Sequence, residues 1–476
     1  MLQPWLFVGF SGHRELADPK LIAERVRDVL RQLGERTGAP LAAVSSVAKG
    51  ADTIFAETAA ELKLPWTLVL PFPVEEFRKD FNKPVEQADW QRVERLLPRS
   101  LRTLIESPVG LRPEAYNDCG IRTVDECDVL LAVWNGQKST DKRGGTGDIV
   151  EYAREIQKPM IWIDPVTGAT TEERCERLPT SKQSTTASEK TGEGSALLKA
   201  TFDHFSNLAK RQRPWAINLN LSLVVLHQLA IITAIAALIW TQQGWLTEPA
   251  GWLKVTFLLV ALVLPWFLGH AHKDWLNNRI RAEICRSATA IWPLHQAEEI
   301  FPTLRLPVYA GLQRSLLLLR LLSPPASPDL QEARSAYETD RVVGQLNYYR
   351  DHAETAARQG RSLRWIAGLC TAVAIVTGIV VTTHVVSKTS YPYVKFLSLV
   401  LPLVAAALLA AIAALDTERR SARYREMAAF LEHARTQIQH TSTWTGLRRV
   451  VAEVERTLLL EIWEWYSVVR FSTKQH

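Results

Sequence analysis

Short apolar runs and helical patterns alternate along the first third of the chain. The runs have the length of buried strands, and helical patterns follow several of them. Repeated strand–loop–helix units predict a parallel, doubly wound α/β sheet with helices on both faces. The apolar runs are Leu6–Val8, Ala42–Val47, Thr67–Leu70, Val129–Val133 and Met160–Ile163, and the helical patterns cover Pro19 to Leu33, a stretch ending at Glu61, and Asp148 to Gln157.

Four long apolar spans dominate the second half of the chain. They are Ile217–Trp240, about Trp252–Gly269, Trp365–Val386 and Phe396–Leu415. A helix needs about 20 apolar residues to cross a bilayer, and the spans are close to this length. The second span contains Lys254 and Pro265, which membrane helices tolerate near an end or where a neighbour compensates. We predict an all-α membrane region of four transmembrane helices in two hairpins; the alternative, a buried soluble helical core, fits uncharged spans of this length poorly.

Basic residues set the expected orientation. They cluster before the first and third spans and after the second and fourth, at Lys210, Arg211, Arg213, Lys273, Arg279, Arg281, Arg358, Arg361, Arg364, Arg419, Arg420 and Arg423. The short connections within each hairpin hold almost none apart from Lys388 and Lys395. By the positive-inside rule, the N- and C-termini and all large segments are cytoplasmic in a multi-pass protein.

Composition shifts mark the domain boundaries. Residues 166–196 are rich in Thr, Ser, Glu and Lys, which predicts a flexible linker after a first domain at 1–165. The first transmembrane hairpin with its flanking helices occupies 197–300, and 301–328 form a connector. The second hairpin with its cytoplasmic helices occupies 329–476.

Charge and cysteine content add little. Lys and Arg number 56 against 50 Asp and Glu, a formal net charge of +6. The five cysteines are scattered without metal-site spacing, so we expect free thiols in a reducing compartment, no metal and no cofactor. The chain starts on a strand-like run without a signal-type segment, so we expect the first domain in the cytoplasm.

Three polar, glycine-containing loops follow predicted strands: Gly9–Arg14, Lys49–Asp52 and Gly136–Glu151. Ligands of doubly wound sheets bind beyond the carboxyl ends of the strands, so the loops predict one pocket. The third loop carries Gly144-Gly145-Thr146-Gly147 directly before a helix, an arrangement that aims backbone N–H groups at a phosphate. A glycine-rich turn without a ligand remains the alternative.

Roles can be assigned within this predicted pocket. Gly12 and Gly50 allow close approach of a ligand, and Arg14 or Lys49 neutralises phosphate or is a surface charge. Arg112 and Tyr116 reach a sugar or base, while Trp134 stacks on one or lies in the core. Asp52 and Glu151 bind ligand or interact with a helix dipole. The full predicted ligand-binding set is Gly9, Ser11, Gly12, His13, Arg14, Lys49, Gly50, Asp52, Arg112, Tyr116, Trp134, Gly144, Gly145, Thr146, Gly147 and Glu151.

The first third resembles a SLOG domain, the Rossmann-like superfamily that includes LOG phosphoribohydrolases and DprA-type proteins. The resemblance rests on Gly9–Arg14, Lys49–Asp52, Cys127–Trp134 and the glycine loop up to Glu151. It implies an α/β Rossmann-like parallel sheet that binds a nucleotide-derived second messenger. In LOG enzymes the motif reads PGGxGTxxE and its Glu is catalytic; Glu151 matches that position, whereas Arg143 and Asp148 replace the Pro and the Thr. The run Gly147–Ala153 with Lys158-Pro159 is also similar to nucleoside deoxyribosyltransferases.

The helix before the third span resembles the approach helix of SLATT domains, two-span effectors paired with SLOG sensors. The resemblance rests on Tyr337, Arg341, Gln345 and Tyr348-Tyr349. The membrane half also looks duplicated, because each hairpin is preceded by a basic helical approach and followed by a long helix.

These patterns and resemblances give a main hypothesis and an alternative. The main hypothesis is a bacterial inner-membrane effector in anti-phage defence, which senses a nucleotide or cyclic nucleotide-type messenger, forms a homo-oligomer in the lipid bilayer and permeabilises it, without binding nucleic acid. The alternative is a membrane-anchored LOG-like N-glycosidic hydrolase or transferase, with Glu151 as the nucleophile or electrostatic stabiliser and Asp148 or Asp52 assisting. Within the first span, His227 and Gln228 line a conducting path or bond between helices.

Overall fold

A computed structural model describes residues 2–108, 112–137, 144–180, 194–241, 244–326 and 328–472. The chain divides into two compact units. The first unit comprises Met1–Ala200 together with Arg305–Pro325, and the second comprises Thr201–Leu304 and Ala326–His476. The first unit is α/β, whereas the second is helical.

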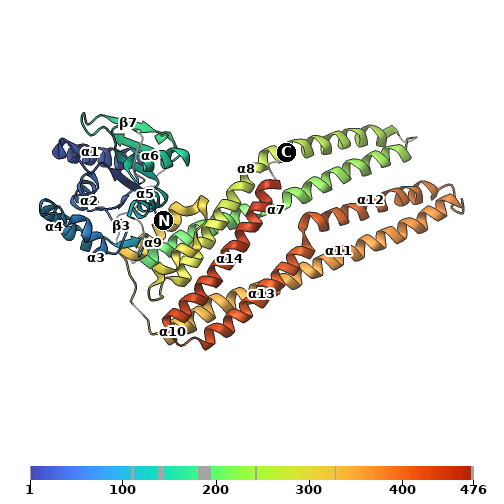
Figure 1. Ribbon diagram of the computed structural model, residues 1–476. Helices are drawn as coiled ribbons and strands as arrows, with labels where there is room; N and C mark the ends of the chain where they lie inside the picture. Colours follow the sequence, from blue (N-terminus) through green and yellow to red (C-terminus); the bar gives the residue numbers. More distant parts are fainter. Residues whose placement is uncertain are drawn as a thin grey trace. The chain divides into compact units, whose positions relative to one another are not determined.

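The first unit is built on one seven-stranded sheet with the order β4-β3-β2-β1-β5-β6-β7. Neighbours from β4 to β6 are parallel, and β7 pairs with β6 antiparallel. The sheet and its helices are seen in Figure 1. The strands are β1 (Leu6–Gly12), β2 (Leu41–Ser45), β3 (Trp66–Leu70), β4 (Arg102–Ile105), β5 (Val129–Val133), β6 (Met160–Ile163) and β7 (Thr170–Glu173), and the helices are α1 (Pro19–Thr37), α2 (Ala51–Glu61), α3 (Val74–Phe77), α4 (Gln87–Leu96), α5 (Arg112–Glu126) and α6 (Thr146–Glu155).

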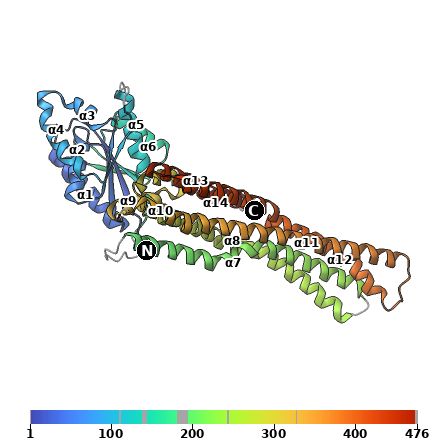
Figure 2. The same ribbon diagram turned by 90° about the horizontal axis from the view of Figure 1, so that it is seen from below.

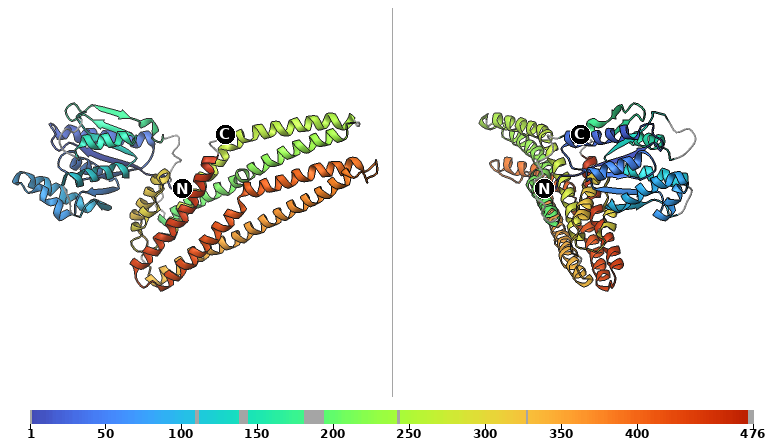
Figure 3. Two further views of the ribbon diagram at one scale, coloured as in Figure 1. Left: turned by 45° about the vertical axis from the view of Figure 1, so that its right-hand side comes forward. Right: turned by 90° about the vertical axis from the view of Figure 1, so that its left-hand side faces the viewer.

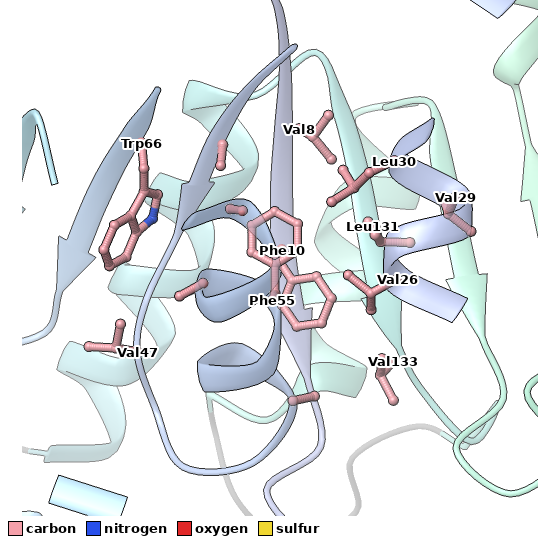
Figure 4. Close-up of a cluster of buried hydrophobic side chains, with 14 of the residues drawn as sticks. Val8, Phe10, Val26, Val29, Leu30, Val47, Phe55, Trp66, Leu131 and Val133 are labelled. Atoms are coloured by element: carbon pink, nitrogen blue, oxygen red, sulfur yellow. The ribbon is translucent and has the colours of Figure 1, made fainter. Parts of the chain in front are cut away.

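Apolar side chains from strands and helices form the core of this unit. Phe10 of β1 stacks on Phe55 of α2, with ring centroids 4.5 Å apart. Val26 and Leu30 of α1 lie in the same cluster, as Figure 4 shows. Burying aromatic and branched side chains is the main favourable term in folding, so this cluster fixes α1 and α2 on the sheet.

The predicted α/β sheet is confirmed, with three local corrections. β1 runs to Gly12, so Gly9 and Ser11 lie within the strand instead of in the predicted loop. β4 was not predicted, because its sequence Arg-Thr-Leu-Ile carries no continuous apolar run. The linker prediction is wrong for Thr170–Glu173, which form β7. That strand has no apolar residue and is held at the sheet edge by ion pairs, Glu172 with Arg36 and Glu173 with Arg154.

A helix from the predicted connector completes the first unit. α9 (Ala310–Leu322) places Leu318 in an apolar cluster with sheet residues such as Phe7 and Leu130. The Ser315 hydroxyl accepts a hydrogen bond from the backbone N–H of Trp5 at 3.0 Å. Arg314 forms an ion pair with Asp128. The segment between the two hairpins is therefore part of the sheet unit.

The second unit consists mainly of long helices, seen in Figures 2 and 3. α7 and α8 form one hairpin, and α11 and α12 form the other. The π-helical turn η9 joins α10 to α11, and α13 and α14 follow the second hairpin. The bounds are α7 (Gly194–Ile239), which starts in the first unit, α8 (Gly244–Ile291), α10 (Leu330–Ala336), η9 (Tyr337–Val343), α11 (Gly344–Thr382), α12 (Tyr391–Leu415), α13 (Thr417–His440) and α14 (Trp444–Ser472).

Within the part of the chain that the structure describes, four helices are long and apolar enough to cross a membrane. Two spans are Leu221–Ile239 and Glu248–Pro265, and the other two lie within Leu330–Thr382 and Tyr391–His440. Only 6% to 11% of the residues in these apolar windows are buried. A soluble helical core would bury such residues, whereas lipid solvates them from outside. The chain is therefore that of a membrane protein with four spans in two hairpins.

A buried ion pair joins distant segments of the second unit. Arg341 of η9 pairs with Glu455 of α14 at 2.5 Å, and their side chains are 6% and 0% exposed. Tyr337 donates its hydroxyl to Glu455 at 2.8 Å, and Arg341 also donates to Ser287 of α8 at 3.2 Å. The network connects the first hairpin to the helices of the second.

Removing one partner of this pair leaves an uncompensated buried charge. We expect Arg341→Met to destabilise the second unit by about 3–5 kcal/mol, and Arg341→Met with Glu455→Met to recover at least half of that loss. Thermal unfolding in detergent micelles measures both. The control is the exposed pair of Arg350 and Glu432, where Arg350→Met should cost about 1 kcal/mol or less. An equal effect at the two pairs would contradict the role of Arg341.

Candidate functional site

The strand order reverses at β1, which lies between β2 and β5. The chain leaves β1 toward β2 on one side and returns to β5 on the other. At such a switch point the loops at the carboxyl ends of the strands diverge and leave room for a ligand. The loop after β1, the loop after β5 and the start of α2 all lie at this edge.

His13 joins these three segments. Its backbone N–H donates to Val133 at the end of β5 at 3.1 Å, and its carbonyl accepts from Ala51 at the start of α2 at 3.1 Å. Its Nε2 accepts a hydrogen bond from the backbone N–H of Asn135 at 3.1 Å. The structure therefore brings the ends of β1 and β5 and the start of α2 together around one residue.

Two glycines permit this close contact between loops. A Cβ on Gly12 would lie 2.5 Å from the Ala51 Cβ. Gly50 has φ +93°, and a Cβ there would lie 2.4 Å from the carbonyl oxygen of Arg14. Gly12 and Gly50 therefore let one loop approach another, and their role in the approach of a ligand stays a prediction. Gly9 also has a packing role, because its Cβ would lie 2.6 Å from the Cys127 sulfur.

Arg14 and Asp52 are the charged groups closest to this junction among the predicted residues. Asp52, in the first turn of α2, is 7% exposed, and burial raises its pKa to about 7. The positive charge of Arg14 and a hydrogen bond from the Gly12 backbone oppose that rise. The Arg14 guanidinium lies 5.0 Å from the ring centre of Tyr116. A buried carboxyl beside a cation at a switch point is a perturbed pair of the kind found at functional sites.

Tyr116 and Arg112 are held by carboxylates that the sequence did not point to. The Tyr116 hydroxyl donates to Asp80 at 2.6 Å. Arg112 pairs with Asp80 at 2.6 Å and with Glu76 at 2.9 Å. Asp80 and Glu76 precede these partners by more than 30 residues, and no local pattern links them. This network positions the Tyr116 ring next to Arg14.

The glycine loop leads into α6 as predicted. Gly145 is the N-cap residue, and its carbonyl accepts from the backbone of Asp148 at 3.0 Å. Gly144 has φ +88° and donates its N–H to the Asp148 carboxylate at 2.9 Å. Thr146 and Gly147 are buried in the first turn. Arg143 lies outside the described residues.

Three further predicted site residues, Lys49, Trp134 and Glu151, interact with other protein groups. The Lys49 ammonium lies 3.8 Å from the Glu86 carboxylate and 3.7 Å from the Asp89 carboxylate. Trp134 is buried, and its indole N–H donates to the carbonyl of Gln137 at 2.8 Å, which is the core role of the two considered. Glu151 lies in the second turn of α6, half-buried. The pKa of Arg154 is raised, first by its hydrogen bond with Glu173, and the Glu151 charge adds to that effect.

Part of the second unit matches a family model. Residues 337–465 match the family model described as "SMODS and SLOG-associating 2TM effector domain 1". The matched range starts at η9 and runs through the second hairpin into α14. No curated protein matches the chain. The resemblance of the second hairpin to SLATT domains is thus confirmed, and it identifies a two-transmembrane effector domain.

The perturbed carboxyl makes the stability of the first unit depend on pH. The folded pKa of Asp52 is raised above its ordinary 3.8. The folded state therefore binds the proton more tightly, and this stabilisation is lost as the pH rises from about 4 to about 7. We expect Asp52→Asn to stabilise the first unit at pH 8 by on the order of 3 kcal/mol and to change little at pH 4.

Pulse proteolysis of the full chain in detergent, followed with an antibody to the first unit, measures this effect. Glu24→Gln, at an exposed position of α1, is the control and should leave the pH dependence unchanged. If the stability of the first unit depends on pH in the same way in Asp52→Asn and in the native chain, then Asp52 is not buried in its protonated form.

Proposed function

We propose that the chain is a bacterial membrane effector of an anti-phage defence system, switched by a nucleotide-derived messenger. The messenger binds at the carboxyl edge of the first sheet, and the hairpins respond by associating and permeabilising the inner membrane. The observation that carries the proposal is the presence, in one chain, of a doubly wound sheet and a 2TM effector domain. The family description names a SLOG partner, and the first unit has the parallel sheet that the SLOG resemblance implies.

The chemistry of the junction around His13 supports a nucleotide ligand. Arg14 supplies a cation, and the α6 N-terminus supplies backbone N–H groups, which together favour a phosphate. The Tyr116 ring offers an apolar face for a base. Binding drives the response only through different affinities for the resting and active states. Loops joined by single hydrogen bonds, such as that from Asn135 to His13, can rearrange at small cost.

The α9 helix provides the link between binding and the membrane. It is part of the sheet unit, yet its chain neighbours on both sides belong to the helical unit. Any shift of α9 is therefore passed along the covalent chain to both hairpins. Because Leu318, Ser315 and Arg314 all contact the sheet unit, α9 follows changes in that unit.

A polar group in the first span supports assembly with a second copy. The Gln228 Oε1 atom is buried and has no hydrogen-bond partner among the described residues. An unsatisfied amide at membrane depth is costly, and a hydrogen bond across a helix interface relieves that cost. His227, next to it, bonds to the carbonyl of Leu223 in its own helix at 2.8 Å. In a homo-oligomer, the Gln228 side chain would have to turn outward to bond to a partner helix.

The first test measures ligand binding and membrane leakage together. The full chain in proteoliposomes is titrated with linear and cyclic nucleotides, while calorimetry measures binding and dye release measures leakage. We expect one nucleotide to bind and to trigger leakage. Arg14→Ala should weaken binding about 10- to 100-fold, the value of one charged contact. Arg31→Ala, on the exposed face of α1, is the control.

Three outcomes count against the proposal or redirect it. If no nucleotide of the panel binds, the proposed sensor role is wrong. If a nucleotide binds without causing leakage, the proposed effector response is wrong. Release of free base that Glu151→Gln abolishes would instead establish N-glycosidic activity.

The second test separates binding from response by detaching α9. We expect Leu318→Asp, which places a charge in the apolar cluster, to abolish nucleotide-triggered leakage while nucleotide affinity changes less than about 5-fold. Leu322→Asp, at an exposed position of the same helix, should leave both unchanged. The same liposome assay measures both variants. Unimpaired leakage from Leu318→Asp would show that α9 does not transmit the signal.

A further inference from the structure

A large cavity lies within the second unit. Its volume is about 1280 Å³, and residues from α7, α8, η9, α11, α13 and α14 line it. This volume exceeds the roughly 300–1,000 Å³ of ordinary small-molecule pockets. Nothing in the nucleotide proposal uses this space.

The lining carries a strong excess of positive charge. Among the described residues, seven lysine or arginine side chains and two glutamates line the cavity. The two carboxylates already have partners, Glu283 with Arg286 at 2.8 Å and Glu461 with Arg423 at 3.2 Å. Arg341 and Arg358 pair with Glu455 and Glu354 outside the lining. The other three cations of the lining, Lys210, Arg279 and Arg420, are outside the ion pairs of the described residues. Like charges held together destabilise a fold unless an anion neutralises them. The cavity is thus complementary to an anion.

A buried nitrogen indicates where an anion would bind. The Nε atom of Arg420 is buried and has no hydrogen-bond acceptor in the described part of the chain. Arg420 lines the cavity. Unpaired guanidinium N–H groups cost free energy that a phosphate oxygen can recover through charge-assisted hydrogen bonds.

Among the cations of the lining, Arg420 lies near the depth of lipid headgroups and Arg358 lies just beyond it. Arg420 follows the end of the fourth span at Leu415 by five residues, and Arg358 precedes the third span at Trp365 by seven. At 1.5 Å per residue these positions lie about 8 and 10 Å beyond the hydrocarbon. The headgroup layer extends roughly 5–8 Å on each side of the core. Leu363 and Leu415 also line the cavity and give it an apolar wall toward the membrane.

Aromatic side chains complete the cationic wall. Tyr348 lies on His352, with ring centroids 3.9 Å apart, and Tyr349 lies 5.5 Å from Tyr424. A tyrosine combines an apolar body with a hydroxyl that bonds to phosphate.

We propose that this cavity binds a phosphate ester, and that its source is the headgroup of an anionic phospholipid held between the two hairpins. Basic pockets between membrane helices on the cytoplasmic side are suited to such headgroups. The bound lipid would neutralise the arginines and bridge α8 to α13. A soluble nucleotide carries the same phosphate chemistry, and the experiment distinguishes the two sources.

The experiment uses the full chain in neutral detergent at about 0.5 M salt. At this salt concentration charges farther apart than about 4 Å are largely screened, which suppresses non-specific attraction. Native mass spectrometry measures binding of phosphatidylglycerol, phosphatidylcholine and ATP. We expect phosphatidylglycerol to bind at least 10-fold more tightly than phosphatidylcholine. Arg420→Gln with Arg423→Gln should lose that preference, whereas Arg419→Gln with Arg425→Gln, which removes the same charge from exposed positions of α13, should retain it.

A second variant keeps the test independent of folding. Glu461→Gln removes a carboxylate from the cavity and should raise the affinity for phosphatidylglycerol about 3- to 10-fold, a gain that a misfolded protein would not show. Equal losses in the two arginine pairs, or no gain from Glu461→Gln, would overturn the site. ATP binding with the same residue dependence, without lipid binding, would support the phosphate site and overturn its lipid source.

Discussion

The buried pair of Arg341 and Glu455 is the interaction on which the membrane half depends. A charge out of water is tolerated when a partner of opposite charge and further hydrogen bonds compensate it, and here Tyr337 and Ser287 add hydrogen bonds to the pair. These residues come from α8, the π-helical turn η9 and α14, so one network ties together segments more than 150 residues apart in the chain. π-helical turns are rare and frequently occur at functional sites, and this one lies at the start of the 2TM effector match.

The tips of the hairpins provide a second contact of a different kind. Trp240, at the end of α7, lies 5.2 Å from Phe396 and 5.7 Å from Tyr393 at the start of α12. These aromatic contacts are weak and adaptable compared with the buried ion pair. The second unit is therefore firmly joined near η9 and loosely joined at the tips. That difference favours motions in which the spans move and the helices around η9 stay fixed. Such a motion would allow the proposed response in the membrane.

Both proposed ligands carry phosphate, yet the two proposed sites would recognise it differently. At the edge of the sheet a single cation, Arg14, faces the buried carboxyl of Asp52 and the ring of Tyr116, so a ligand must replace existing internal contacts. In the cavity of the second unit the Nε atom of Arg420 lacks an acceptor among the described residues, and a headgroup would add a contact there without displacing one. A site that must rearrange suits a signal, whereas a site already complementary to its ligand suits a permanent structural lipid.

The sequence by itself determined which part of the chain forms an α/β sheet and which part forms membrane spans. Repeated apolar runs gave the parallel sheet, the glycine loop indicated that a helix follows it, and long apolar runs gave the four spans, because each of these signals is local. Only the tertiary structure decided what depends on contacts between distant segments. Examples are the edge strand β7, which has no apolar residue, the packing of α9 on the sheet, and the hydrogen bond from the Tyr116 hydroxyl to Asp80. The same holds for the glycines, since Gly12 and Gly50 are needed for loops that meet only once the sheet has formed.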